Sequence, residues 1–590
     1  MATIDSGQQD EITFLNSLTP GGTVAPDTFW AWNFDTPATY HATSLAYKWG
    51  DSSPGVGATV SYRFDSASNW SAAERQGFSA AFSLWSAVAD VKFTETQEDV
   101  AQITVMRGDD ELAATRIRGV TGSPIGSTTL DTPTTQIISI DTSVRGYSPI
   151  GAPFDVAGGE PWLTILHEIG HSLGLGHGGP YNDGVSTLAR SVYDNIAWTV
   201  MSYHGSGQWG VNRAETAYNA PTTWRPLDIL AIQRMYGVAV DTPLSGGQTY
   251  GFNSNIAGEI HKFFDFTENS RPVVTLWNKG LNNVLDLSGF TTTSSVDLRD
   301  GAFSSVAGLS NNVGIAYGTR IDTAITGAAN DAIMGNDNGN VIMAGAGSDS
   351  INGGNGNDHL YGAAATATPG DGPDAILGGG GSDYIQGNAG NDLLSGNAGS
   401  DRIQGGQGND IIDGGAGNDS VNGNLGDDTI DGGDDSDSLR GGQGNDSLSG
   451  GAGNDLLQGD LGNDNLSGGG GVDLLTGGGG SDLFVFAVGD AIPWGSATDG
   501  ITDFTDGDDR IRLGQGAPSN VLQGQSFEDF AMAAASAQQM LGSQGSSSVV
   551  ALRIGSDSYI FYATGPSAPL ETIRLAGLSN PALIGAADFA

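Results

Sequence analysis

The sequence contains no cysteine among its 590 residues. Disulfide bonds are therefore excluded, and so are metal sites built on thiolate ligands. A chain of this length is expected to hold two to four domains with ample hydrophobic core.

Basic residues and glutamate are both scarce. The chain has 23 Lys and Arg against 67 Asp and Glu, a formal net charge of -44 at pH 7. Because phosphate groups would repel so acidic a chain, we expect no nucleic-acid partner. Only 12 of the acidic residues are Glu, and 55 are Asp. The short Asp side chain is favoured in turns and calcium loops, so this charge indicates a cationic partner.

Long apolar segments are also missing. No run of about 18 apolar residues occurs, so we expect no transmembrane segment. Residues 1–10 lack the basic stretch followed by an apolar one that a cleavable signal peptide requires. Residues 1–40 are polar and rich in turn-forming residues, and we expect a leader or a short pro-segment there.

One stretch, residues 167–177, has the spacing H-E-x-x-H-x-x-G-x-x-H. Residues four apart share one face of a helix, so His167 and His171 can direct imidazole nitrogens to one point. Gly174 tolerates the left-handed conformation that ends a helix, which lets His177 close the triangle. Three neutral imidazoles suit Zn²⁺ and leave a fourth position for water, as in a catalytic site. The competing interpretation is an amphipathic helix whose histidines only pack.

The chemistry expected at such a site is hydrolysis. Bound Zn²⁺ lowers the pKa of its water and polarises a carbonyl group. Glu168 can take the proton from that water and pass it to the leaving amine. Met201 follows the third histidine at the distance expected of a Met-turn.

Strand and helix patterns surround this motif. Ser71 and Glu74 form a capping box before a run of apolar residues at helical spacing. Alternation predicts strands at residues 58–64, 91–94, 103–105 and 136–140. A further helix is expected at residues 227–236, ended by Gly237.

From about residue 326 the chain repeats every nine residues in the pattern G-G-x-G-x-D-x-U-x, where U is apolar. In such a loop the carboxylate and the backbone carbonyls face Ca²⁺, and the apolar residue of the next short strand points inward. The aspartates expected to bind Ca²⁺ are Asp349, Asp358, Asp374, Asp383, Asp392, Asp401, Asp410, Asp419, Asp428, Asp446, Asp455, Asp464, Asp473 and Asp482.

Folding of these repeats is expected to depend on calcium. Without the cation the stacked carboxylates repel one another, and one buried side chain per nine residues makes a small core. Ala329, Asn338 and Asp435 stand where the pattern has Gly, which weakens those repeats. The competing interpretation is a disordered acidic linker, but the fixed register of Asp and apolar residue argues against it.

The zinc stretch, residues 200–203 and residues 228–237 together resemble the serralysin family of secreted metzincin zinc metalloproteases, which carry C-terminal RTX calcium-binding repeats. The similarity covers the chain from about residue 45 to the end. It implies an α+β metzincin catalytic domain, with a twisted sheet and an active-site helix, followed by an all-β parallel β-roll and a β-rich cap. The expected division is 1–40 leader or pro-segment, 41–240 protease domain, 241–325 β-rich connecting region, 326–486 RTX β-roll, and 487–590 cap and type I secretion signal region.

The resemblance also assigns roles to single residues. In the family, the tyrosine two residues after the Met-turn methionine ligates zinc at rest and swings away to stabilise the oxyanion, and Tyr203 holds that position. Met201 is implied to lie beneath the zinc as a hydrophobic floor. Before the roll the family usually shows G-G-x-D-T-x-D, whereas residues 280–286 are G-L-N-N-V-L-D. This chain departs from the family at that calcium site.

In the cap, residues 500–513 resemble the segment that follows RTX rolls. A helix from Ser526 and a hairpin around residues 555–558 are expected. Residues 586–590 look like the uncleaved C-terminal signal of type I secretion. The resemblance therefore implies export by a type I ABC exporter of a Gram-negative bacterium, an extracellular monomer, and protein or peptide substrates. A proteinaceous inhibitor is a further candidate partner, and attachment to the cell surface is an alternative location.

A second hypothesis assigns the main function to the roll. The chain would then be a calcium-loaded surface-binding or cell-surface array module with a vestigial protease. The large number of repeats motivates this hypothesis. The presence of every residue needed for zinc hydrolysis argues against it, because a decayed enzyme would be expected to lose at least one.

Overall fold

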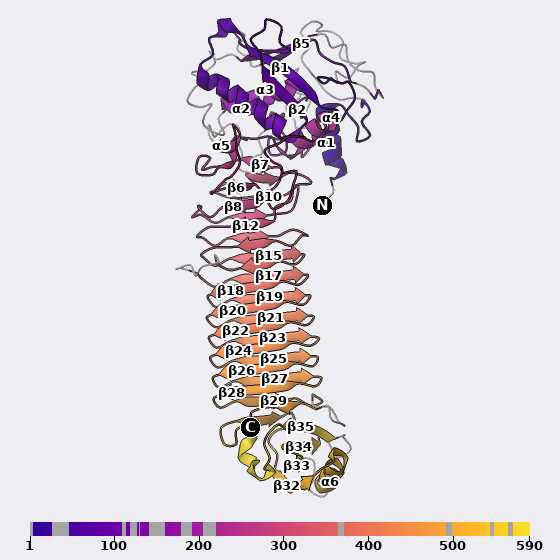
Figure 1. The fold of residues 1–590 in the computed structure, drawn as a ribbon, viewed down its shortest axis with the longest axis vertical. Coiled ribbons are helices and arrows are strands. Elements are labelled where there is room, and N and C mark those ends of the chain that lie inside the picture. The colour runs from indigo at the N-terminus through magenta and orange to yellow at the C-terminus, as the bar shows by residue number, and fades with distance from the viewer. Residues whose placement is uncertain are drawn as a thin grey trace. The chain divides into compact units, whose positions relative to one another are not determined.

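The computed structural model describes residues 4–25, 47–108, 114–118, 127–128, 130–140, 160–178, 191–204, 220–363, 371–490, 498–542, 548–563 and 570–590. The chain divides into two compact units, Met1–Thr326 and Gly327–Ala590 (Figure 1). Among the described residues, no helix is long and apolar enough to cross a membrane.

The first unit contains a five-stranded sheet in the order β2-β1-β3-β5-β4. Four strands are parallel, and β4 at one edge runs antiparallel to β5. The bounds are β1 (Ala58–Phe64), β2 (Val91–Glu95), β3 (Ile103–Arg107), β4 (Ala114–Arg118) and β5 (Thr135–Ile140). The four strands expected from alternation are confirmed, with small shifts at their ends.

Four helices accompany this sheet: α1 (Ser6–Asn16), α2 (Ala72–Val88), α3 (Glu160–Ser172) and α4 (Pro226–Tyr236). The capping box predicted for α2 is confirmed, because Ser71 Oγ accepts from Glu74 N and the Glu74 carboxylate accepts from Ser71 N. The large apolar residues of α2, such as Phe78 and Trp85, are fully buried. The helix expected at 227–236 is also confirmed, beginning one residue earlier at Pro226.

The N-terminal stretch, expected to be a leader or pro-segment, contains α1. This helix packs on α4, where Asn16 donates its amide to the carbonyl of Ala231 at 3.0 Å. Arg234 of α4 in turn donates to Gln9 Oε1 at 2.8 Å and to the carbonyl of Leu18 at 2.7 Å. These contacts, with buried Ile12 and Leu15, attach residues 4–25 to the first unit.

The rest of the first unit consists of short elements. They are β6 (Thr249–Gly251), α5 (His261–Phe264), β7 (Val274–Leu276), β8 (Val284–Asp286), β9 (Ser295–Asp297), β10 (Phe303–Ser304), β11 (Val313–Ile315) and β12 (Thr323–Ile325). The strands β6, β8 and β12 are parallel neighbours, and β7 pairs in parallel with β11.

The second unit confirms the predicted parallel β-roll. From β13 to β29, each strand pairs in parallel with the strand two places further along the chain, so that alternate strands build two facing sheets (Figure 1). The strands are β13 (Ala332–Met334), β14 (Val341–Met343), β15 (Ser350–Asn355), β16 (His359–Tyr361), β17 (Ala375–Gly380), β18 (Tyr384–Ala389), β19 (Leu393–Ala398), β20 (Arg402–Gln407), β21 (Ile411–Ala416), β22 (Ser420–Leu425), β23 (Thr429–Asp434), β24 (Ser438–Gln443), β25 (Ser447–Ala452), β26 (Leu456–Leu461), β27 (Asn465–Gly470), β28 (Leu474–Gly479), β29 (Leu483–Phe486), β30 (Gly500–Ile501) and β31 (Arg510–Leu513).

A cap follows the roll, with β32 (Asn520–Phe527), α6 (Phe530–Gly542), β33 (Ser548–Ile554), β34 (Asp557–Ala563) and β35 (Leu570–Leu575). The hairpin expected around 555–558 is confirmed as the antiparallel pair β33 and β34. The helix expected from Ser526 is wrong at its start. Ser526 still pairs with Arg553 in the sheet, and Asp529 caps the helix by accepting from Ala531 N at 2.8 Å. A capping Asp side chain favours a helix start just after it.

The core of the roll is a column of single apolar residues. Ile412 in β21 is 1% exposed, whereas its neighbour Ile411 points outward and is 56% exposed. The two side chains differ only in the face they occupy, since successive residues of a strand point to opposite sides.

This pair makes a matched test of the core. We expect Ile412→Ala to lower the free energy of unfolding of the calcium-loaded roll by about 2–5 kcal/mol, because it leaves a cavity. Ile411→Ala should change it by less than about 0.5 kcal/mol. Urea unfolding followed by circular dichroism measures both. Equal effects of the two substitutions would contradict the described facing of β21.

Candidate metal centres

Three histidines of the zinc motif converge at the end of α3. The Nε2 atoms of His167 and His171 each lie 3.1 Å from Nε2 of His177. All three rings are buried, and their ligand atoms lie within 4.8 Å of one another. Tetrahedral Zn²⁺ with bonds of about 2.0–2.1 Å would separate its ligands by about 3.3 Å. The spacing therefore fits one tetrahedral ion.

Two of these rings are held by backbone carbonyls. His167 Nδ1 lies 2.9 Å from the carbonyl of Val200, and His171 Nδ1 lies 2.8 Å from the carbonyl of Leu175. A carbonyl only accepts, so each Nδ1 carries the proton and each Nε2 keeps a lone pair for a metal. Burial also lowers the pKa of His171 to about 4, which keeps this ring neutral as a ligand has to be.

The end of α3 is closed by residues that the sequence motif does not contain. The side chains of Tyr47, Trp49 and Tyr236 donate to the carbonyls of His171, Ser172 and Leu173. The last carbonyls of a helix lack partners within the helix, so these three donors fix where α3 stops. Gly174 then turns the chain with φ +98°, and a Cβ there would lie 2.3 Å from the carbonyl oxygen of Tyr47.

Met201 lies against α3, the helix that carries His167 and His171. A Cβ added to Gly170 would stand 2.6 Å from Met201 Sδ, so glycine at this position permits the close approach. Met201 is fully buried. The turn that carries it is held by Asp228 of α4, whose carboxylate accepts from Thr199 Oγ1 at 2.6 Å and from Val200 N at 2.9 Å.

Asp228 therefore acts on the histidine cluster indirectly, through Val200. It fixes Val200, whose carbonyl receives Nδ1 of His167. Burial raises the pKa of Asp228 to about 6, although the hydrogen bonds it accepts and nearby Arg225 oppose that rise. Arg225 is itself fully buried and donates to the carbonyls of Ala197 and Val274. The sequence places Asp228 within residues 228–237, which resemble the serralysin family, but no motif predicted a role for it.

The other two predicted residues of this centre also lie near the histidines. The Tyr203 ring stacks on the His167 ring with centroids 5.5 Å apart and packs on the His177 ring at 4.4 Å. It remains 41% exposed, so it covers the cluster from the solvent side. Glu168 follows His167 on α3 and is 5% exposed.

Three further histidines lie outside this cluster. His204 follows Tyr203 and donates its backbone N–H to Ser202 Oγ. His261 lies in α5, where its Nε2 stands 3.1 Å from Asp265 Oδ2 and 3.6 Å from Glu268 Oε1 at the surface. His359 begins β16 in the roll. His41 lies outside the described residues.

The predicted calcium aspartates form two columns inside the roll. In each column the Oδ1 atom of one Asp accepts the backbone N–H of the Asp one turn earlier, as in Asp392 to Asp410 to Asp428. The second column contains Asp383, Asp401 and Asp419 in the same arrangement. All fourteen predicted aspartates are at most 3% exposed.

The second carboxylate oxygen in these columns has no such partner. For every predicted aspartate except Asp482, Oδ2 is buried and makes no hydrogen bond within the described part of the chain. From Asp358 on, each Oδ2 lies close to a glycine, and a Cβ on Gly405 would stand 2.3 Å from Asp410 Oδ2. A buried carboxylate oxygen without a partner is costly unless a cation binds it. These residues therefore fit Ca²⁺, which prefers oxygen ligands.

The structure extends the columns beyond the predicted set. Asp437, in a repeat weakened by Asp435, accepts from Asp419 N at 2.8 Å like its neighbours, because Asp435 adopts the required positive φ of 76°. After the regular repeats, Asp499 accepts from Asp473 N and Asp509 from Asp482 N, both at 3.0 Å. The sequence signal for these two was the Asp-x-apolar triplet, at 499–501 and 509–511.

The position that departs from the family pattern is held by hydrogen bonds. Asn283 donates its side-chain amide to the carbonyls of Gly280 and Arg320 at 2.9 and 2.8 Å. Its backbone N–H donates to Asp322 Oδ2 at 2.9 Å. An uncharged amide thus connects these segments where the family pattern has a carboxylate.

Comparison with known proteins finds one matching family model and several proteins of similar sequence. The family model for the serralysin C-terminal region of M10 peptidases matches residues 241–562. A serralysin of Proteus mirabilis is 36% identical over 269 residues, which cover 44% of this chain and 53% of that protein. A serralysin of Photorhabdus laumondii subsp. laumondii is 33% identical over 307 residues, 51% of this chain and 60% of that protein.

A metallopeptidase AprA of Pseudomonas marginalis is 41% identical over 186 residues, 30% of this chain and 38% of that protein. The chain thus spans about four to six tenths of the length of these relatives. The family model covers more than half of the chain, in the region that contains the aspartate columns. The chain belongs to the serralysin family of M10 peptidases.

Proposed function

We propose that this protein is a zinc-dependent endopeptidase whose roll is folded by calcium. The single observation that carries the proposal is the convergence of three buried imidazole Nε2 atoms, two of them with Nδ1 committed to a carbonyl. The Nε2 lone pairs of His167 and His171 both face Nε2 of His177 at 3.1 Å, an arrangement that a cation between the three rings would stabilise. The metallopeptidase names of the relatives support the same activity.

The chain's own residues supply the rest of the mechanism. When bound, zinc supplies an activated water and a Lewis acid for the scissile carbonyl. His167, His171 and His177 would hold it. Glu168, adjacent to His167 and buried, would take the proton from the attacking water at its carboxylate and deliver it to the amine that leaves. Low exposure keeps this carboxylate away from bulk water.

Tyr203 is assigned two roles in the proposal. Its position over the rings of His167 and His177 supports a hydroxyl that ligates the resting centre and then donates to the oxyanion of the substrate. Met201 would serve as the apolar floor of the zinc site. Its Sδ lies close to Gly170, which stands between His167 and His171 in the sequence.

Calcium is proposed for the aspartate columns. Their partnerless Oδ2 atoms, buried beside glycines, support cation binding along the roll. We extend the set to Asp437 and Asp499, which continue the same hydrogen-bond pattern and also have a buried Oδ2 without a partner among the described residues. The division of the chain into leader, protease, connecting region, roll and cap remains part of the proposal, as do type I export, an extracellular monomer, and protein or peptide substrates.

The alternative function is a calcium-loaded surface-binding module with a vestigial protease. One observation favours it, namely the large number of strands in the roll, from β13 to β31. Zinc content and peptide hydrolysis of the purified chain decide between the two.

The first test removes the proposed base. Glu168→Ala should lower casein hydrolysis by several orders of magnitude, on the order of 10³-fold or more, while zinc content stays at one per chain. Glu98→Ala, which changes an exposed Glu of the same unit, is the matched control and should keep full activity. Undiminished turnover of Glu168→Ala would rule out this mechanism.

A second test isolates the Tyr203 hydroxyl. Tyr203→Phe keeps the ring over the histidines and should lower kcat by about 10²-fold with little change in KM, because it removes one donor to the oxyanion. Zinc content should not change. Tyr361→Phe in the roll is the control. A change in KM alone would assign Tyr203 to substrate binding.

The third test concerns the roll in a calcium-free buffer. Burial raises the pKa of Asp410 to about 7, and the carboxylates of Asp392 and Asp428 add to the rise. Burial and its own neighbouring carboxylates likewise raise the pKa of Asp374 to about 8. Because these values exceed the ordinary 3.8, the stability that these groups contribute near pH 4 is lost progressively as pH rises to about 7 to 8.

In EGTA, the β signal in circular dichroism should therefore be stronger at pH 5 than at pH 8. Excess Ca²⁺ should restore it at pH 8, since the cation neutralises the ionised columns. A calcium-free roll that is more ordered at pH 8 than at pH 5 would contradict the burial of these carboxylates without partners.

A further inference from the structure

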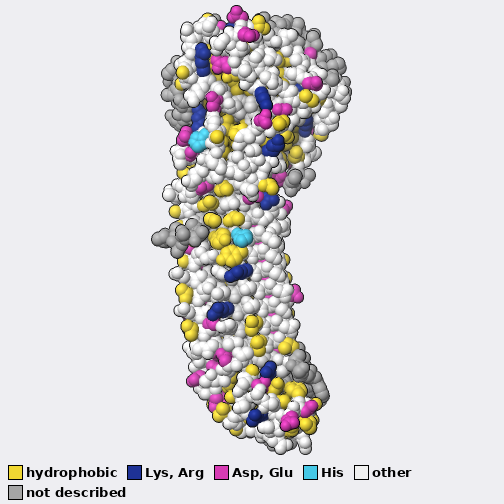
Figure 2. All heavy atoms as spheres, viewed as in Figure 1, with side chains coloured by type: hydrophobic (Ala, Val, Ile, Leu, Met, Phe, Trp, Pro, Cys, Tyr) yellow, Lys and Arg dark blue, Asp and Glu magenta, His cyan; other side chains and the backbone are white. Residues whose placement is uncertain are grey.

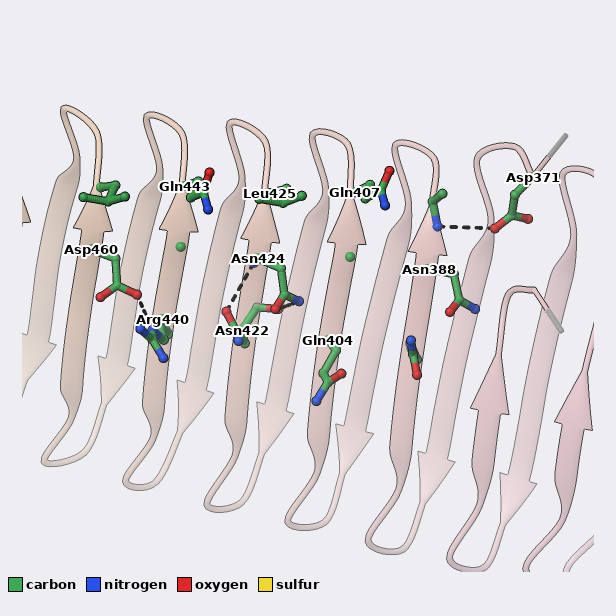
Figure 3. A pocket seen from close by; sticks show the side chains of 15 residues that line it. Asp371, Asn388, Gln404, Gln407, Asn422, Asn424, Leu425, Arg440, Gln443 and Asp460 are labelled. Atoms are coloured by element: carbon green, nitrogen blue, oxygen red, sulfur yellow. Dashed lines mark hydrogen bonds and ion pairs between the residues drawn. The ribbon is translucent and has the colours of Figure 1, made fainter. Parts of the chain in front are cut away.

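One outer face of the roll is hollowed along its length. The hollow has a volume of about 980 Å³ and crosses β18, β20, β22, β24 and β26. It is lined mainly by the side chains of Asn and Gln (Figure 3). Neighbouring strands lie about 4.8 Å apart, so these five strands present a groove about 19 Å long.

The amides line up because the strands are in register. Gln386, Gln404 and Asn422 occupy equivalent positions on three adjacent strands. A second row alternates Asn388 and Asn424 with glycines at 406 and 442, which lack side chains and so deepen the hollow. Figure 3 shows the labelled amides on one side of the sheet.

The opposite sheet carries no such row. At the equivalent outward positions β21 and β23 have Asp413 and Asp431, and β25 and β27 have Ser449 and Ser467. Calcium binding and core packing use both sheets alike. The amides on one sheet are therefore not required by either, and they point to a separate role.

An aromatic group lies at one end of the amide row. The Tyr384 hydroxyl is 3.2 Å from Gln386 Oε1 and 3.4 Å from Gln404 Oε1, which ties both amides to the ring. The rings of Tyr361 and His359 each lie 5.7 Å from that of Tyr384, centroid to centroid. On the same strand as Tyr384, the Nδ2 atom of Asn388 is buried and has no hydrogen-bond partner among the described residues.

The groove is close to neutral in a strongly acidic protein. Arg440 is paired with Asp460 across two of its strands, which leaves Asp371 as the remaining charged lining residue. The face of the roll seen in Figure 2 is likewise mostly uncharged. A polyanionic ligand would find no excess positive charge here, and the net charge of the chain would repel it.

The ligand chemistry follows from these features. Amides donate and accept at once, which matches rows of hydroxyl groups, and flat aromatic rings pack on the apolar faces of sugar rings. A peptide that bound by adding a strand would need an open strand edge, but β20, β22 and β24 are hydrogen-bonded on both sides. We propose that this face of the roll binds a neutral polysaccharide, extended along the row of amides from Tyr384 to Arg440.

The test is affinity electrophoresis of the full-length Glu168→Ala chain, with Ca²⁺, in native gels. Separate gels contain dextran, soluble starch, galactomannan or alginate. At least one of the three neutral glycans should retard the chain, and alginate should not. Retardation by alginate alone, or by none of the four polymers, overturns the proposal. Because the test reads binding alone, it is independent of the protease activity.

A pair of variants locates the site. Gln404→Ala with Asn422→Ala should weaken the retarding interaction about tenfold or more, because two hydrogen-bonding side chains are lost. Ser449→Ala with Ser467→Ala on the opposite sheet is the matched control and should bind as before. Equal losses in both would overturn the proposal. Gln404→Glu preserves shape and serves if circular dichroism shows the first variant to be misfolded, with the same loss expected.

Discussion

The roll depends on carboxylates that are buried in columns without a second partner. Each Asp is needed for the fold, since its Oδ1 accepts the backbone N–H of the previous turn. From Asp349 to Asp473, its Oδ2 is at the same time left without a hydrogen bond among the described residues. The fold thus requires charges that it cannot itself neutralise, and the burial of these groups raises their pKa. In the proposed function a divalent cation resolves the conflict, which would make the most repetitive part of the chain the most dependent on its surroundings.

The histidine centre rests on a different constraint, the exact stop of one helix. If α3 continued for another turn, His177 would leave the cluster. Donors from Tyr47, Trp49 and Tyr236 satisfy the carbonyls at that end, and Gly174 makes the turn. Asp228 holds the neighbouring turn and, through Val200, the ring of His167. Segments far apart in the sequence therefore determine the geometry of ligands that are ten residues apart.

The roll also shows how a repeat can carry two kinds of information. Positions that point inward are nearly invariant along the chain, because every rung meets the same core and the same carboxylate column. Positions that point outward are free to vary between rungs. On one sheet they collect amides and an aromatic group, and on the other they collect Ser and Asp. A solenoid of this kind can change its binding surface without disturbing its folding.

The sequence by itself determined the ligand types and the local elements. The spacing of His167, His171 and His177 and the nine-residue period of the aspartates are local periodicities, which a helix or a repeating strand converts directly into position. It misplaced the start of α6, where strand pairing of Ser526 prevailed over helix propensity. Only the tertiary structure brought Tyr47 and Tyr236 to the end of α3 and Asp228 to the turn beside it. It also brought Asp499 and Asp509 into the columns after intervals of 26 and 27 residues. Such contacts join distant segments at irregular spacing, and no local period encodes them.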